Sequence, residues 1–213
     1  KMHDASSLDA AVEVTAWRGK TPPSQLPAPK GTVTTLQPLD DSALVVPVAD
    51  ATRAKIPVVI IDSALKSNDH VSFVATDNRQ GGKLAGEALA NLLPNGGKIV
   101  LIRYAEGSAS TAEREEGFLE AIRARNNFII LSSNQYGGAD VEGAYKKSEA
   151  VLNRFKAGDG TLAVDGIFAP NESVSHGMMR VLEDNAWAGK VKFIGFDASD
   201  TLVKGLADGH IDG

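Results

Sequence analysis

Short apolar runs rich in β-branched residues alternate with longer amphipathic segments from about residue 31 to the end of this 213-residue chain. Several of the short runs are continuously apolar, as expected for parallel strands that are covered on both faces. Strands are expected at residues 31–36, 57–62, 98–103, 128–132, 166–169 and 191–196, and helices at 43–55, 81–93, 111–125, 141–157, 173–185 and 200–207. This alternation predicts βαβ units and an open, doubly wound parallel sheet.

The first thirty residues do not follow this pattern. Residues 6–12 fit the end of a helix and 14–17 a short strand, whereas 20–30 hold four prolines and no apolar periodicity. A helix is expected between two parallel strands, and this segment does not supply one. We expect either an irregular connector or residues missing at this point, and we favour the second.

Composition excludes several classes of function. The formal net charge is −5, and no run of basic residues exceeds Lys146–Lys147, which argues against a nucleic-acid partner. The absence of cysteine removes thiolate catalysis, cysteine-based zinc sites and disulfides. The four histidines are scattered, without an H-x-H or H-E-x-x-H pair, so we expect no metal site.

Motifs of catalysis are also missing. The sequence has no G-x-S-x-G elbow, no G-x-x-x-x-G-K-[ST] phosphate loop and no G-x-G-x-x-G between a strand and a helix. We therefore expect no enzyme and no cofactor. No apolar stretch approaches the roughly 20 residues that span a bilayer. Because no signal peptide is visible at Lys1, we expect a cytoplasmic chain or a mature form whose signal has been removed.

Polar side chains follow nearly every expected strand, at the edge where open α/β sheets bind ligands. Carboxylates, amides, a guanidinium and an aromatic ring are together suited to a polyhydroxylated ligand. The residues are Gln37, Asp40, Asp41, Asp62, Ser63, Arg103, Tyr104, Glu106, Ser108, Arg114, Asn134, Gln135, Tyr136, Asn171, Glu172 and Asp197.

Some of these residues have an equally good structural interpretation. Asn171 and Asp197 precede expected helices and could serve as helix N-caps. Ser110 and Glu113 fit a capping box, which we favour over a functional role.

Others differ in how strongly they favour function. Arg114 taken alone fits a surface ion pair. Asp62 ends an apolar strand, where a carboxylate needs a partner, so we favour a functional role. Tyr136 fits rim packing and ligand contact equally well.

Five segments in consistent order resemble the successive motifs of ribose-type periplasmic sugar-binding proteins, whose fold is shared with the effector domains of LacI-type repressors. They are PVVIIDS (57–63), VATDNRQGG (74–82), EGSASTAEREEGF (106–118), DGIFAPNES (165–173) and KFIGFDASD (192–200). The resemblance covers about residues 31–213. It implies a type I periplasmic binding protein fold, with two Rossmann-like lobes, parallel sheets and a hinge, and with the sugar between the lobes. An N-terminal lobe at 1–103 and a C-terminal lobe at 104–213 are expected.

The resemblance also implies roles for individual residues. Asp62 and Asp197 correspond to sugar-hydroxyl acceptors in opposite lobes, and Arg114 to the ligand-binding arginine. Asn171 matches the asparagine after F-A-x. Gln37 stands where the family often has an asparagine, and Tyr136 lies near a family aromatic in a loosely matched region.

The function implied is to bind a monosaccharide or similar polyol and to deliver it to the membrane permease of an ABC importer. The protein is expected to be periplasmic and monomeric. The alternative is the effector domain of a LacI-type regulator, for which no helix-turn-helix headpiece is visible. The family's first strand and last crossover have no counterpart, so the fold is expected to be incomplete at both ends.

Overall fold

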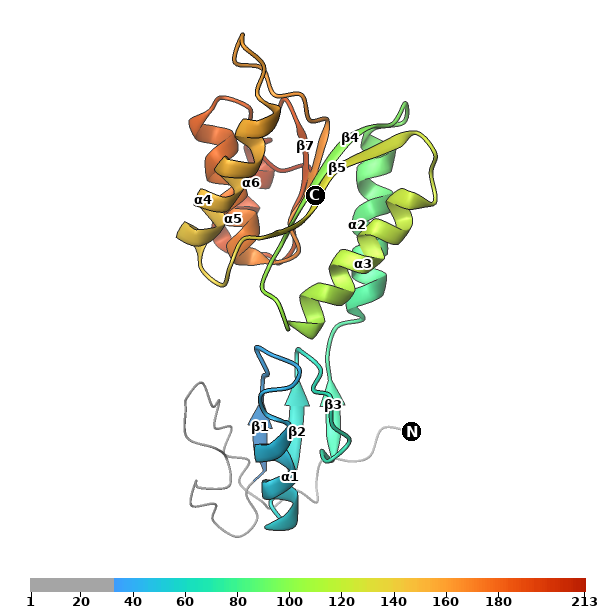
Figure 1. Cartoon of the computed structure of the whole chain (residues 1–213), viewed down its shortest axis with the longest axis vertical. Helices are drawn as coiled ribbons and strands as arrows, with labels where there is room; N and C mark the ends of the chain where they lie inside the picture. The colour runs from blue at the N-terminus through green and yellow to red at the C-terminus, as the bar shows by residue number, and fades with distance from the viewer. Residues whose placement is uncertain (1–32) are drawn as a thin grey trace. The chain divides into compact units, whose positions relative to one another are not determined.

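The computed structural model describes residues 33–213, which form two compact units (Figure 1). The first unit contains the described residues through Thr76 together with Gly107–Ser110, and the second contains Asp77–Glu106 and Thr111–Gly213. The helix end, strand and proline-rich connector expected before residue 31 lie outside the described residues.

The described residues of the first unit form a three-stranded parallel sheet with one helix. Strands β1 (Thr34–Leu36), β2 (Val58–Ile61) and β3 (Ser72–Val74) pair in the order β1-β2-β3. Helix α1 (Val45–Arg53) buries Val48 and Ala51, which belong to one core cluster with Leu36, Val58 and Ile60.

Strand β3 was not expected from the sequence. It is three residues long and all three are exposed, so it has no buried apolar face that a pattern could reveal. Only its backbone pairing with β2 defines it.

The second unit is a four-stranded parallel sheet in the order β5-β4-β6-β7, covered by helices on both faces (Figure 1). Its strands are β4 (Gly97–Arg103), β5 (Phe128–Tyr136), β6 (Gly166–Phe168) and β7 (Lys192–Ile194). Its helices are α2 (Asn78–Leu92), α3 (Ala109–Arg123), α4 (Val141–Leu152), the short 3-10 helix η3 (Asn153–Phe155), α5 (Glu172–Asp184) and α6 (Asp200–Ala207). Although α3 begins at Ala109, its first residues group with the first unit.

Strand β4 is buried on both faces of the sheet, which explains why its sequence is a continuous apolar run. Ile99 and Leu101 belong to a core cluster with residues of α2 and α3. Val100 and Ile102 belong to another, with residues of α4, α5 and α6. Because successive side chains of a strand point to opposite faces, a strand covered on both sides is apolar at every position. The expected parallel α/β fold is confirmed.

The compact units divide the chain at a different place from the expected lobe boundary. Residues of α2 and β4 pack in one core cluster with residues of β6 and β7, so the chain enters the second unit after Thr76. The expected boundary after Arg103 falls inside that unit. The assignment of lobes in a longer protein stays a prediction.

Helices α2 and α3 approach each other so closely that glycine is required at the contact. A Cβ on Gly82 would lie 1.9 Å from the carbonyl oxygen of Arg114, and one on Gly117 would lie 2.1 Å from that of Arg79. The two backbones are therefore in direct contact, which fixes the first turn of α2 beside the first turns of α3.

Candidate ligand-binding site

Arg114 lies near the start of α3, and its side chain is buried in the second unit, with 6% of the residue exposed. Its Nε donates to Oδ1 of Asn78 at 2.8 Å, and its Nη1 donates to the carbonyl oxygen of Pro170 at 2.9 Å. The same Nη1 lies 3.5 Å from Oδ1 of Asp197. The guanidinium carbon is 3.9 Å from the centroid of the Phe196 ring. These contacts exclude a surface ion pair as the role of Arg114.

Asn171 and Asp197 both meet the N-terminus of α5. Asn171 is the N-cap, and its Oδ1 accepts from the backbone N–H of Val174 at 3.3 Å. Asp197 accepts from the backbone N–H of Glu172 at 2.9 Å through Oδ2. The first N–H groups of a helix have no partner within it, and its N-terminus favours negative charge. The expected capping by Asn171 is thus confirmed. Asp197, in contrast, accepts from the N-terminus of α5 and does not cap the following helix α6, whose N-cap is Ser199.

The first unit brings two of the expected residues together. Gln37 follows β1 and Asp62 follows β2, which are neighbouring parallel strands. The Nε2 of Gln37 donates to Oδ2 of Asp62 at 2.9 Å, and both residues are exposed.

Asp62 and Asp197 share an unusual backbone conformation. Asp62 has φ of 65° and Asp197 has φ of 72°, and among residues 33–213 Lys55 and Ala186 are the other non-glycine residues with positive φ. This region is unfavourable for residues with a Cβ, although aspartate and asparagine tolerate it better than most. Strained positions of this kind gather at functional sites.

Tyr136 ends β5 and is 40% exposed. Its backbone is in register with Arg103 of β4. The described hydrogen bonds around Arg114 and the N-terminus of α5 do not include it.

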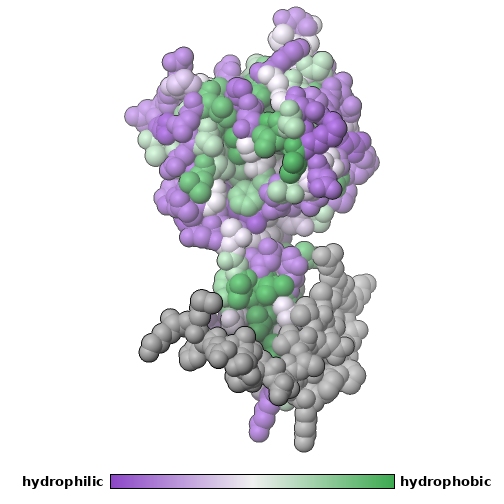
Figure 2. Space-filling view, turned by 180° about the vertical axis from the view of Figure 1, so that it is seen from behind, coloured by the Kyte–Doolittle hydropathy of each residue, from purple (hydrophilic) through white to green (hydrophobic). Residues whose placement is uncertain are grey.

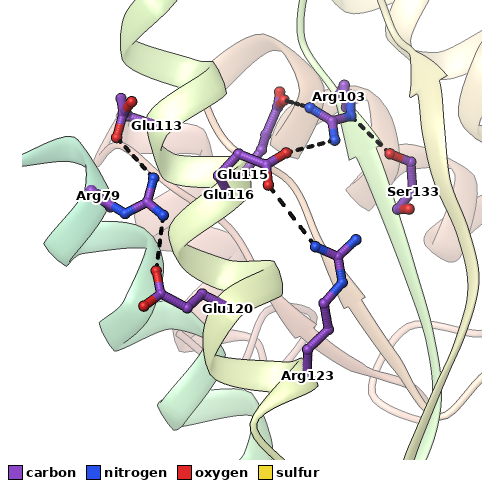
Figure 3. A network of polar contacts seen from close by, with 8 residues as sticks. All are labelled: Arg79, Arg103, Glu113, Glu115, Glu116, Glu120, Arg123 and Ser133. Carbon is purple, nitrogen blue, oxygen red and sulfur yellow. Dashed lines mark hydrogen bonds and ion pairs between the residues drawn. The ribbon is translucent and has the colours of Figure 1, made fainter.

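A second polar network in this unit was missed by the sequence reasoning (Figure 3). Arg103 donates from Nη1 to Glu115 at 2.8 Å, from Nη2 to Glu116 at 3.0 Å, and from Nε to the carbonyl oxygen of Ser133 at 2.8 Å. Glu115 also accepts from the backbone N–H of Tyr104 at 3.0 Å. The network holds α3 against the carboxyl end of β4 and joins that end to β5. Two adjacent glutamates on a helix give no signal that one of them is buried.

Glu115 is the buried member of that pair, with 2% of the residue exposed. Desolvation raises the pKa of its carboxyl, although the Tyr104 N–H and the Arg103 guanidinium act in the opposite direction. Glu115 adjoins Arg114 in sequence, so this anchor holds the helical turn that carries the guanidinium.

The expected capping box at Ser110 and Glu113 is wrong. Ser110 lies inside the first turn of α3, and its backbone N–H donates to Oγ of Ser63 at 3.1 Å. Glu113 pairs with Arg79 of α2 at 3.4 Å. Both residues are engaged by partners far away in sequence, and a local motif cannot anticipate such partners.

Hydrophobic as well as hydrophilic residues are exposed on the second unit (Figure 2). The large exposed hydrophobic residues there include Leu84, Ile129, Val203 and Leu206. An apolar groove of about 390 Å³ shares Phe196 and Asp197 with the polar cluster, and its other lining residues are Gly195, Ala198, Leu202, Val203, Leu206, Ile211 and Gly213.

Residues 33–213 contain neither a candidate metal site nor a candidate membrane span. No group of three or more histidine, aspartate or glutamate side chains is placed to hold a metal ion. No helix in this range combines the length and apolar character needed to cross a membrane.

Residues 32–213 match the family model described as periplasmic binding protein domain. The ribose import binding protein RbsB of Salmonella typhimurium is 32% identical over 176 residues, covering 83% of this chain and 56% of that protein. The D-ribose/D-allose-binding protein of Pseudomonas aeruginosa is 30% identical over 182 residues, covering 83% and 54%. The chain thus spans a little over half the length of these curated relatives.

Solved structures agree with the sequence relatives. An ABC transporter solute-binding protein from Agrobacterium vitis with bound D-fucose has a TM-score of 0.78 and 34% identity, covering 85% of this chain and 61% of that one. The periplasmic component of an ABC-type sugar transport system from Hahella chejuensis has a TM-score of 0.78 and 32% identity, covering 84% and 63%. The resemblance to ribose-type binding proteins is confirmed, and the chain belongs to the periplasmic binding protein domain family.

Proposed function

We propose that this protein binds a monosaccharide or a similar small polyol and does no chemistry on it. The observation that carries the proposal is the buried Arg114, which lies against Asn78, Asp197 and the Phe196 ring. A sugar needs charged donors and acceptors for its hydroxyl groups and an aromatic surface for its C–H face. The cluster offers a guanidinium, a carboxylate and a ring within one unit.

Asp62, Gln37, Asn171 and Tyr136 are proposed as further ligand contacts. Asp62 and Gln37 form an exposed acceptor and donor pair at the carboxyl ends of β1 and β2. Ligands of open α/β sheets bind at such strand ends. Asn171 caps α5 beside Asp197, and Tyr136 ends β5.

We further propose that the whole protein is a monomeric periplasmic component that delivers its ligand to an ABC importer. The names of its relatives support this, since they include ribose import binding proteins and ABC transporter solute-binding proteins. A non-enzymatic role without a nucleic-acid partner fits the same relatives.

The test is calorimetry of the 213-residue chain against D-ribose, D-allose, D-fucose, D-arabinose and a series of simple polyols. At least one should bind with a dissociation constant of about a micromolar or below, which corresponds to a binding free energy of roughly −8 kcal/mol or stronger. The bound compound should be recovered unchanged after prolonged incubation. Failure of every compound to bind, or consumption of the one that binds, would contradict the proposal.

A further inference from the structure

Asn78 is the first residue of α2, and it contacts Arg114 directly. It is 9% exposed, and its Oδ1 accepts the Arg114 Nε–H at 2.8 Å. Nε is the guanidinium nitrogen nearest the backbone and carries a single hydrogen. A hydrogen bond at this atom therefore limits rotation of the whole planar group, which determines the direction of the remaining donors.

The backbone around Asn78 gives this contact little freedom to change. Gly82, one turn along α2, is pressed against the Arg114 carbonyl oxygen, to which a Cβ would come within 1.9 Å. A Cβ on Gly81 would lie 3.0 Å from the Phe196 ring, on which the Arg114 guanidinium stacks. The first turn of α2 thus adjoins the backbone of Arg114 and the ring beneath its side chain.

The chemistry of the acceptor also matters. An amide oxygen is neutral, so it orients the guanidinium without cancelling its positive charge, whereas Asp197 contributes the negative charge of the cluster at 3.5 Å. An arginine that binds hydroxyl groups needs a fixed direction and a charge that strengthens its hydrogen bonds.

We propose that Asn78 is a positioning residue for Arg114, fixing the guanidinium in the orientation that receives the ligand. The part that concerns ligand affinity rests on the proposed function. The contact at Nε can be tested whether or not a sugar binds.

The first measurement is the solvent exchange of the Arg114 Nε–H in the ¹⁵N-labelled 213-residue chain, with the signal assigned by its loss in Arg114→Lys. Exchange should be slow in the wild type and fast in Asn78→Leu, which has a similar volume and no acceptor. Asn78→Asp keeps an acceptor oxygen in place and should restore slow exchange. If Asn78→Leu does not fold, Asn78→Ser, whose side chain is too short for the contact, replaces it.

The matched control is Arg79→Gln. It changes the next residue of the same helical turn, whose side chain joins α2 to Glu113 and Glu120 of α3 and has no described contact with the Arg114 side chain. This variant should leave the exchange of the Arg114 Nε–H unchanged. A similar acceleration in Arg79→Gln would show that helix placement, and not the acceptor, controls Arg114, and would overturn the proposal.

The second measurement is calorimetry with the sugar of the panel that binds the wild type most tightly. Asn78→Leu should weaken binding roughly tenfold or more, the range for a lost hydrogen bond to a charged group. Asn78→Asp keeps the acceptor but adds a negative charge beside the guanidinium, so it should recover only part of that affinity. Unchanged exchange and unchanged affinity in Asn78→Leu would refute the role of Asn78. A wild type that binds no sugar would refute the proposed function, while the exchange measurement would still decide whether Asn78 fixes Arg114.

Discussion

The two units hold their candidate binding residues in different ways. In the second unit, Arg114 is 6% exposed and contacts Asn78, Pro170, Asp197 and Phe196. In the first unit, Asp62 and Gln37 are both exposed, and their side chains are joined by one described hydrogen bond, to each other.

The difference shows two ways in which a polar side chain can be held in one orientation. Arg114 has a long side chain with many rotamers, so several partners are needed to hold it in one orientation. Asp62 has a short side chain whose direction follows from the backbone. Its N–H donates to the carbonyl oxygen of Val74, and its φ of 65° turns the chain sharply after β2. We expect substitutions in the second unit to change both stability and binding, and those in the first to change binding alone.

Arg114→Lys should have the largest effect. Lysine keeps the charge but loses the planar fork, and Asn78 Oδ1 and the Pro170 carbonyl lose their donors. Affinity for the best sugar should fall about ten- to a hundredfold, and the free energy of unfolding by about 1–3 kcal/mol. Calorimetry and urea unfolding measure the two. A variant that loses neither would show that the buried contacts of Arg114 have no role in binding or folding.

Gly82→Ala tests the contact between α2 and α3 that supports the cluster. The new Cβ would overlap the Arg114 carbonyl oxygen, so the helices must separate. Strain of this kind lowers the free energy of unfolding by about 1–3 kcal/mol, which urea unfolding detects. Gly158→Ala is the matched control, because a Cβ there meets nothing within 4 Å. Equal effects of the two variants would contradict the importance of the helix contact.

Asp62→Asn and Asp197→Asn compare the two units most directly. Each removes a charged acceptor and should weaken sugar binding by about 1.5–3 kcal/mol, roughly ten- to a hundredfold. Asp62→Asn should leave the melting temperature unchanged, since asparagine also tolerates positive φ.

Asp197→Asn should in addition destabilise the fold by about 0.3–1 kcal/mol, because it removes a negative charge from the N-terminus of α5. Thermal unfolding without sugar separates the two variants. A lower melting temperature for Asp62→Asn than for Asp197→Asn would contradict the expected difference between the two units.

Glu115→Gln should show the smallest effect, visible as a dependence on pH. Burial raises the pKa of the Glu115 carboxyl above its usual 4.5. At pH values between 4.5 and the raised pKa of the folded state, the folded chain binds more protons at Glu115 than the unfolded chain. This group therefore makes the free energy of unfolding fall as pH rises. The difference in stability between wild type and Glu115→Gln should therefore turn against the wild type from about pH 4.5 upward and then level off. Urea unfolding of both proteins at several pH values measures this difference in the free energy of unfolding. A difference that grows in favour of the wild type as pH rises would contradict a raised pKa of Glu115.

The sequence alone was sufficient for most of the fold. The apolar periods placed the strands and helices of residues 33–213, apart from β3, because such periods are properties of neighbouring residues. The motif resemblance named the family. The sequence also placed Gln37, Asp62, Asn171 and Asp197 at strand ends, since the carboxyl edge of a parallel sheet is fixed by topology.

Only the tertiary structure decided how these side chains are held. The partners of Arg114 lie 36 residues away at Asn78 and 56 residues away at Pro170. Asp197 caps a helix that begins 25 residues before it, at Glu172. The quoted motifs contain Asn78, Gly82 and Glu115 but do not show that these residues are buried or what they contact, because burial and hydrogen bonding arise when distant segments pack together. Residue type and spacing determine which groups reach the edge of the sheet, and packing between helices determines which of them are fixed there.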